Sequence, residues 1–145
     1  MSKTFTLHEA QTLLPVLEAL LSKARAAALR GAELELAMRE LTQRIFLAGG
    51  TRVDVTAAAH RRAEREKLAQ EAKDTLAEIE SIGVMVQDLQ AGHLEFPSLL
   101  EGRTILLCWT IGQPAIEHWR EADDAVGERR PLDGRFHRGE RERLN

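Results

Sequence analysis

The sequence predicts an α+β domain, made of a long antiparallel helical hairpin, a small three-stranded antiparallel meander and a short C-terminal helix. Three observations support this fold class. A long apolar seam has helical spacing, a Gly-Gly pair separates two helical segments, and the apolar period becomes alternating after Gly83. We expect one domain over residues 1–134, with the helical part at 7–83, the sheet and short helix at 84–126, and a flexible tail at 135–145.

The first helix is expected to begin at a capping box formed by Thr6 and Glu9. At this spacing the Thr6 hydroxyl can accept from the N–H of Glu9, while the Glu9 carboxylate accepts from the N–H of Thr6. Pro15 lacks a backbone donor, so we expect a short helix at 7–13 and a new helix start near Pro15. An apolar seam with the alternating three- and four-residue spacing of a coiled coil then follows. Its members are Leu17, Leu20, Ala24, Ala27, Gly31, Leu34, Met38, Leu41 and Ile45.

A second helix is expected to follow the turn at Gly49-Gly50, with Thr51 or Asp54 as its N-cap, and to end at Gly83. The tight turn makes the two helices antiparallel. The mixed-sign charged run at 60–74 indicates a solvated helix face. The seam has two interpretations: it is the internal core of the hairpin, or it also joins two hairpins. A two-helix hairpin about 50 Å long cannot bury both of its faces alone, so we expect a homo-oligomer that forms through the hairpin.

Alternating residues after Gly83 predict three strands, at 84–89, 93–97 and 103–109. The second strand is expected to end at Pro97, which cannot donate to a ladder. The third strand is apolar on both faces, so we expect it to be the central strand. The turns between the strands are expected at 90–92 and 101–102.

The segment after the third strand carries the two tryptophans of the chain, Trp109 and Trp119. Pro114 suits the first turn of a helix, so a short helix is expected at 114–119. Because aromatic residues make up only 4% of the chain, the simplest interpretation is that both indoles form a plug between the sheet and the helices.

Besides the plug, this segment has two functional interpretations. The first is a divalent transition-metal site at His118, Glu121 and Asp124, which share a face if the segment is helical. The alternative for these three residues is an exposed acidic helix face. The second is a binding groove at the edge of the sheet. Its candidate residues are Trp109, Gln113, Glu117, His118, Trp119 and Arg129.

Composition excludes several classes of protein. The net charge of −3 and the pI near 6.0 make nucleic acid an unexpected partner, although the arginine-rich tail leaves that interpretation open. No apolar segment is long enough to span a membrane, and the N-terminus does not resemble a signal peptide. The single cysteine, Cys108, fits a cytoplasmic protein, and its apolar strand is typical of a small core residue with a raised pKa rather than a nucleophile.

Several motifs together resemble the bacterial domain-of-unknown-function family 2203. They are FTLHEAQTLLP near the N-terminus, GVMVQDLQAGHLEFPSLLEGRTILLCWTIGQPAIEHW in the second half, and ERRPL after it. The family pattern has an acidic residue at the position of Gln113 and a histidine at that of Arg120. Because this chain departs from the pattern at both positions, the resemblance implies no metal ligand there. It also implies no activity, since the family has none assigned.

These observations favour a non-enzymatic cytoplasmic module that acts through protein–protein contacts and self-associates, without a cofactor. The alternative is a metal-binding protein or metal-dependent hydrolase that uses residues 113–124.

Overall fold

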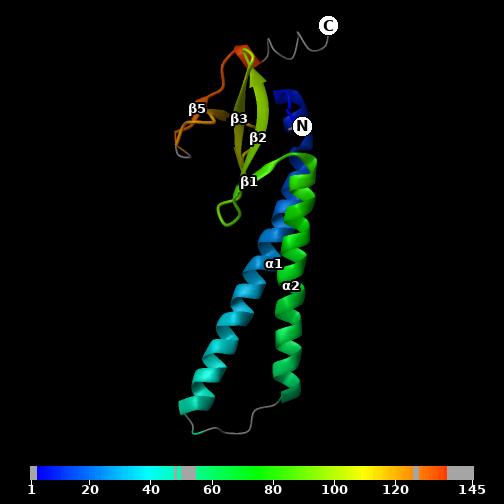
Figure 1. Ribbon diagram of the computed structural model, residues 1–145, viewed down its shortest axis with the longest axis vertical. Coiled ribbons are helices and arrows are strands. Elements are labelled where there is room, and N and C mark those ends of the chain that lie inside the picture. The colour runs from blue at the N-terminus through cyan, green and yellow to red at the C-terminus, as the bar shows by residue number, and fades with distance from the viewer. Residues whose placement is uncertain (1–2, 48, 50–54, 126–127, 137–145) are drawn as a thin grey trace.

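The protein is described by a computed structural model that covers residues 3–47, 49, 55–125 and 128–136. Helices α1 (Leu7–Leu47) and α2 (Val55–Ile82) form an antiparallel hairpin. The sheet lies beside the end of the hairpin that carries the N-terminus of α1, and the rest of the hairpin projects beyond it (Figure 1). The predicted α+β class and helical hairpin are confirmed.

The predicted capping box begins α1. The N–H of Glu9 donates to the Thr6 hydroxyl over 3.1 Å, and the N–H of Thr6 donates to the Glu9 carboxylate over 2.9 Å. Two of the backbone donors that a helix start leaves without a partner are thereby satisfied.

The predicted break at Pro15 is wrong, because α1 is a single helix of 41 residues. Pro15 itself is exposed, while Ala10 and Leu14 before it and Leu17 and Leu21 after it are buried along one face. A proline inside a helix removes one hydrogen bond and costs about 3 kcal/mol. Burial of the large apolar side chains on both sides of it offsets this cost, since each contributes about 1.5–3 kcal/mol.

The hairpin brings α1 and α2 together side by side. A Cβ placed on Gly31 would lie 3.9 Å from the Cβ of Leu68, so the helix backbones approach closely at this point. Gly83, with φ +105°, ends α2 as predicted, and Gly49, with φ +74°, follows α1. The predicted N-cap of α2, Thr51 or Asp54, lies outside the described residues.

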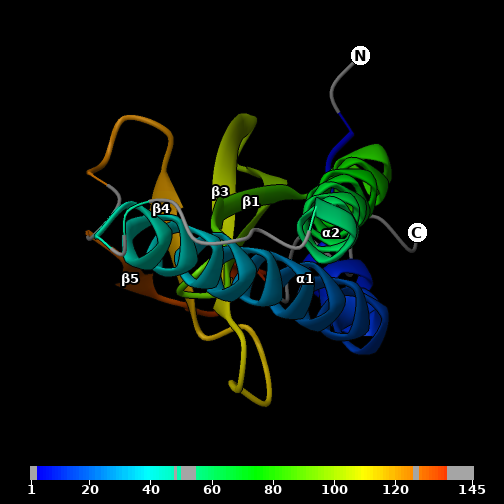
Figure 2. The same cartoon turned by 90° about the horizontal axis from the view of Figure 1, so that it is seen from below.

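The two helices diverge toward the loop that joins them. They are adjacent where the sheet lies and are clearly separated at the far end, in the side view and in the view from below (Figures 1 and 2). Burial follows the same trend, since the last buried residue of α1 is Leu34 and the first buried residue of α2 is Ala72. We call residues 35–47 and 55–71 the distal arm.

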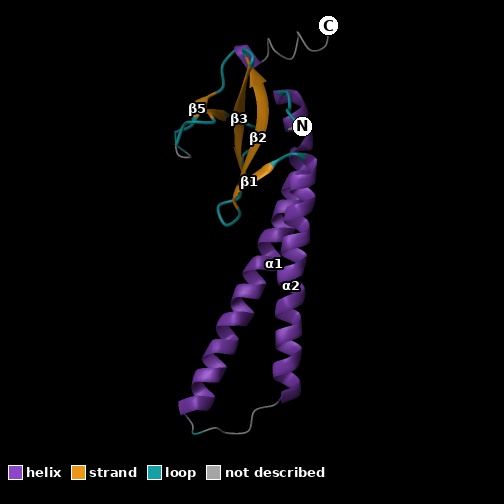
Figure 3. Cartoon of the chain, viewed as in Figure 1, coloured by secondary structure: helices purple, strands orange, loops and turns teal. Residues whose placement is uncertain are grey.

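Five strands, rather than the predicted three, form the sheet in the described part of the chain (Figure 3). Each strand is antiparallel to its neighbours, in the order in which the strands follow one another along the chain, and β3 is central as predicted. Their bounds are β1 Met85–Asp88, β2 His93–Leu100, β3 Arg103–Thr110, β4 His118–Glu121 and β5 Arg130–Pro131.

Strand β2 continues through Pro97 to Leu100, beyond its predicted end. β1 pairs only with the first part of β2, up to Glu95, and the carbonyl of Pro97 accepts instead from the N–H of Phe5 over 2.7 Å. The N–H and C=O of a residue in an antiparallel strand point to the same side. The missing N–H of Pro97 therefore faces away from β3, and the β2–β3 ladder loses no hydrogen bond.

The predicted C-terminal helix at 114–119 is wrong, because this segment is a turn that leads into β4. β4 pairs with β3 and places Trp119 opposite Leu107. A six-residue helix is too short to be stable without tertiary support. Pairing with β3 satisfies the backbone of β4 and buries Trp119 in the core at the same time.

The sheet has a core face, which packs against the N-terminal half of α1, and an outer face on the opposite side. Phe5 and Phe96 meet edge to face across the core with ring centroids 5.8 Å apart. Trp109 and Trp119 are both buried in this core, so the plug interpretation of the two indoles is confirmed. The Trp109 indole N–H donates to the carbonyl of Gln113 over 3.0 Å.

The end of the described chain also packs on this core. Phe136 is buried, and its ring centroid lies 5.7 Å from that of Trp119. Arg135 lies over the same indole and pairs with Glu101. The first two residues of the predicted tail thus contact the domain, and residues 137–145 lie outside the described residues.

Candidate functional site

The three predicted metal ligands do not converge. His118 and Glu121 are three positions apart in β4, so they point to opposite faces of the sheet. The Glu121 carboxylate lies 2.6 Å from Arg103, and the Asp124 carboxylate accepts from the N–H of Glu121 and from Arg130. Within the described ranges, no three histidine, cysteine or carboxylate side chains are grouped so that they could hold a metal ion.

The six residues of the predicted groove are also divided between different surfaces. Trp109 and Trp119 are covered on the core face, whereas His118 lies on the outer face. Gln113 is a structural residue of the turn, because its side-chain oxygen accepts from the N–H of Thr110 over 3.0 Å. Glu117 is exposed. Arg129 donates to the hydroxyl of Thr110, the last residue of β3.

A buried polar layer, which was not predicted from the sequence, lies on the outer face of the sheet. The carboxylate of Glu95, in β2, forms a bidentate ion pair with the guanidinium of Arg120, in β4. The two contacts are Nε to Oε2 at 2.5 Å and Nη2 to Oε1 at 2.8 Å. Cys108, on β3 between them, has its Sγ 3.7 Å from Glu95 Oε2. Arg120 also donates to the carbonyl of Asp124 over 2.9 Å, and this bond holds the segment after β4 close to the ion pair.

The environment of Cys108 makes it a poor nucleophile. Burial, and then the negative charge of Glu95, raise the pKa of its thiol to about 11. The positive charges of Arg129 and Arg120 act in the opposite direction but do not prevail. Since the thiolate is the reactive form, the thiol is inert near neutral pH. The raised pKa predicted for a small core cysteine is confirmed.

Beside the buried pair, three side chains meet where β2 begins and β3 ends. His93 and Thr110 are directly opposite in the ladder, and His93 Nδ1 lies 2.7 Å from Thr110 Oγ1. The guanidinium of Arg129 donates to the same Oγ1 over 3.3 Å. All three side chains are half-buried. We call His93, Thr110 and Arg129 the outer triad.

Sequence analysis missed Glu95 and Arg120 as a pair, and His93 as a member of the triad. One available signal was the two-residue turn at Glu101 and Gly102, with φ +51° and +81°, because such a turn fixes the register of its hairpin. That register places Glu95 opposite Cys108 and His93 opposite Thr110. The contribution of Arg120 had no such signal, since β4 was expected to be helical.

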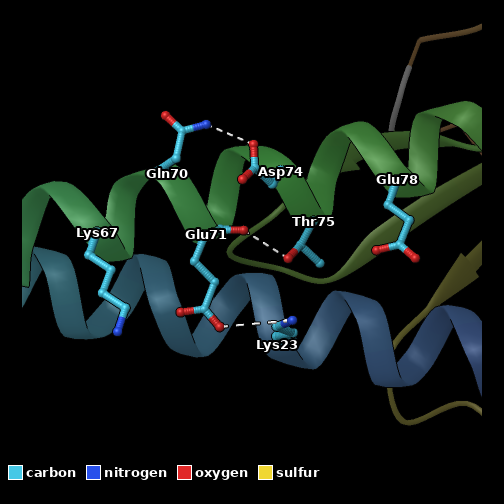
Figure 4. A pocket seen from close by; sticks show the side chains of 7 residues that line it. All are labelled: Lys23, Lys67, Gln70, Glu71, Asp74, Thr75 and Glu78. Atoms are coloured by element: carbon cyan, nitrogen blue, oxygen red, sulfur yellow. Dashed lines mark hydrogen bonds and ion pairs between the residues drawn. The ribbon is translucent and has the colours of Figure 1, made fainter.

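A charged hollow of about 650 Å³ lies between α1 and α2 (Figure 4). Glu71 reaches across to Lys23, with the charged atoms 4.0 Å apart, while Gln70 donates to Asp74 within α2. Nearly all of its lining side chains are polar and exposed or half-buried. The hollow is therefore a solvated surface between two helices, as expected for the charged run at 60–74. The residues that line it are Lys23, Lys67, Gln70, Glu71, Asp74, Thr75 and Glu78.

The distal arm, together with the two turns of α1 before it, carries the other surface of interest. Leu29, Leu36 and Leu47 are 63%, 56% and 74% exposed. Their spacings of seven and eleven residues return to the same helix face, so they form one outer stripe along α1. The side of α1 that carries this stripe also carries Arg25, which donates to the carbonyl of Gln90 in the β1–β2 turn over 2.9 Å. The stripe thus continues the sheet-facing side of α1 beyond the point where the sheet ends.

These features define an α+β domain in which a five-stranded sheet is joined to a projecting helical hairpin. A family model described as an uncharacterized conserved protein (DUF2203) matches residues 3–132, so the chain belongs to this family. Neither the curated proteins nor the solved structures give a significant match. Neither α1 nor α2, as far as they are described, is long and apolar enough to cross a membrane.

Proposed function

We propose that the protein is a non-enzymatic protein–protein interaction module that self-associates through the distal arm of its hairpin. The observation that carries this proposal is the incomplete burial of the arm. The outer stripe of Leu29, Leu36 and Leu47 is exposed on the side of α1 away from the seam. The seam residues Met38, Leu41 and Ile45 are themselves only half-buried within one chain.

Helices gain most of their stability from tertiary packing of an apolar face. The distal arm has little packing of this kind, because none of its described side chains is fully buried. Phe46 and Val55, at its tip, are 82% and 75% exposed. Contact with a further protein surface would supply the missing burial.

A second copy of this chain is the partner that fits best. The helices of the arm are about 20 and 25 Å long, so a surface about 20 Å wide gives roughly 450 Å² for each copy, or about 900 Å² in total, which is the size of a weak, reversible interface. Opposite charges alternate along α1 in the arm, at Glu35, Arg39, Glu40 and Arg44. Two identical surfaces of this kind can meet about a two-fold axis without net repulsion.

The test compares molar masses by size-exclusion chromatography with light scattering. Leu29→Glu/Leu36→Glu adds two charges to the outer stripe, and Val16→Glu/Leu99→Glu adds the same charges at side chains that are 54% and 58% exposed outside it. The wild type and the control variant should elute as a dimer or larger assembly, and the stripe variant as a monomer. A monomeric wild type at about 0.1 mM, or equal masses for both variants, would overturn the proposal.

The alternative function, a divalent transition-metal site at His118, Glu121 and Asp124, remains a prediction. Its test is the metal content of the protein purified without chelator. His118→Ala should abolish metal retention if the prediction holds, and Glu117→Ala, which changes an exposed neighbour, should not.

A further inference from the structure

We propose that the outer triad, His93, Thr110 and Arg129, is a binding site for a small oxyanion, such as a phosphate or carboxylate group. This inference concerns the sheet rather than the distal arm and does not depend on the proposed function.

The outer face of the sheet has an unbalanced positive charge at Arg129. Glu95 is the carboxylate of this layer, and both of its oxygens are already held by Arg120. The Asp124 carboxylate is held by Arg130 and by the N–H of Glu121. Arg129 has no carboxylate within ion-pair distance among the residues that the structure describes. A half-buried guanidinium therefore remains without a counter-charge, which is a costly arrangement unless an anion completes it.

The outer triad also has more hydrogen-bond donors than it uses. Arg129 has five N–H donors, and one of them is used, toward Thr110. The bond between His93 Nδ1 and Thr110 Oγ1 consumes one proton, whichever atom supplies it. If Thr110 donates, the Nε2–H of His93 is left over; if His93 donates, the hydroxyl proton of Thr110 is left over. In both arrangements the triad has spare donors from more than one side chain.

The three side chains of the triad are held in a fixed arrangement. β-Ladder pairing fixes His93 opposite Thr110, and Arg129 reaches the same hydroxyl from the segment that leads into β5. The donors are thus held by three different parts of the sheet around a single oxygen. A planar guanidinium fork is suited to two oxygens of one carboxylate or phosphate. We infer that an oxyanion would bind with two oxygens on Arg129 and a further contact to Thr110 or His93.

The test is a titration with inorganic phosphate, and separately with acetate, at ionic strength held constant with chloride. Binding is followed by the side-chain NMR signals of Arg129 Nε–H and His93, and by the melting temperature. The wild type should show saturable shifts of both signals and a rise in melting temperature with at least one of the two anions. Saturation by phosphate alone would assign a tetrahedral ligand, and saturation by acetate would assign a carboxylate.

Variants separate a built site from general attraction of anions. Arg129→Gln should weaken binding about tenfold or more, because a hydrogen bond to a charged group is lost together with the charge. Arg61→Gln removes an exposed arginine of α2 and should change nothing. Thr110→Val keeps the charge and should give an intermediate loss, which keeps the proposal testable if Arg129→Gln folds poorly. Absence of saturable shifts in the wild type, or equal binding by Arg129→Gln and the wild type, would overturn the proposal.

Discussion

Glu95 and Arg120 form a bidentate ion pair across an intervening strand. They belong to β2 and β4, and the pair passes over Cys108 on β3. Both side chains are almost completely removed from solvent, with 1% and 9% of their surface exposed. The pair therefore joins β2, which was predicted from the sequence, to β4, which was not.

Removal of one partner of this pair should destabilise the fold strongly. Arg120→Met leaves the Glu95 carboxylate buried without a counter-charge, and the free energy of unfolding should fall by about 3–5 kcal/mol. The double variant Glu95→Leu/Arg120→Met replaces both partners by apolar groups, and it should recover most of this loss. Urea denaturation of the wild type, both single variants and the double variant measures the coupling. If the single and double variants lose equal stability, the pair is not the unit that we describe.

Cys108 should be protected and should make stability depend on pH in the alkaline range. The folded-state pKa of about 11 is above the ordinary value of 9.0, so the unfolded chain loses its thiol proton first. The contribution of Cys108 is then fully present below pH 9 and is lost as the pH rises toward 11. It should amount to about 2–3 kcal/mol. Cys108→Ala should flatten this part of the stability curve relative to the wild type, and a thiol reagent at pH 8 should label the wild type only after denaturation. Rapid labelling of the folded protein would contradict the burial of the thiol.

Gly92 should tolerate a side chain much less well than Gly102. Both have positive φ, +75° and +81°, so alanine is strained at either position by roughly 1 kcal/mol. A Cβ on Gly92 would also lie 2.3 Å from Cγ2 of Ile111, whereas nothing lies within 4 Å of one on Gly102. Gly92→Ala should cost about 1–3 kcal/mol more than Gly102→Ala. Thermal denaturation of the two variants side by side decides the matter, and equal costs would mean that Ile111 moves aside freely.

Pro15→Ala should stabilise the protein. Pro15 is exposed within a continuous helix, so alanine would restore one backbone hydrogen bond without removing a buried contact. The gain in helix stability, reduced by the greater freedom of the unfolded chain, should be about 1–2 kcal/mol. The melting temperature measures it directly. A decrease would show that the proline shapes α1 for its packing on the sheet.

Local signals were sufficient for the helices and for the first three strands. The capping box at Thr6 and the glycines at 49 and 83 each act through their own neighbours in sequence, and each was found where expected. The apolar seam of α1 is buried as far as Leu34. The break at Pro15 failed as a prediction because the cost of a proline is local, while the burial that offsets it comes from the sheet and cannot be seen in the helix alone.

The last two strands and the outer face depended on long-range pairing. Residues 114–119 have apolar spacing that suits one turn of helix, and only the free edge of β3 makes a strand the better solution. The same error grouped His118 with Glu121, because residues three positions apart share a face of a helix. In β4 the two side chains point to opposite faces of the sheet. The Glu95–Arg120 pair followed from that strand, so it could not be found before β4 was placed.

Self-association through the distal arm is most directly tested by native mass spectrometry of the protein purified without chelator. The polypeptide mass is 16.2 kDa. We predict a dominant species at twice this mass or a higher multiple, which reverts to the single mass in Leu29→Glu/Leu36→Glu. A wild type that stays at the single polypeptide mass at about 0.1 mM would contradict the account.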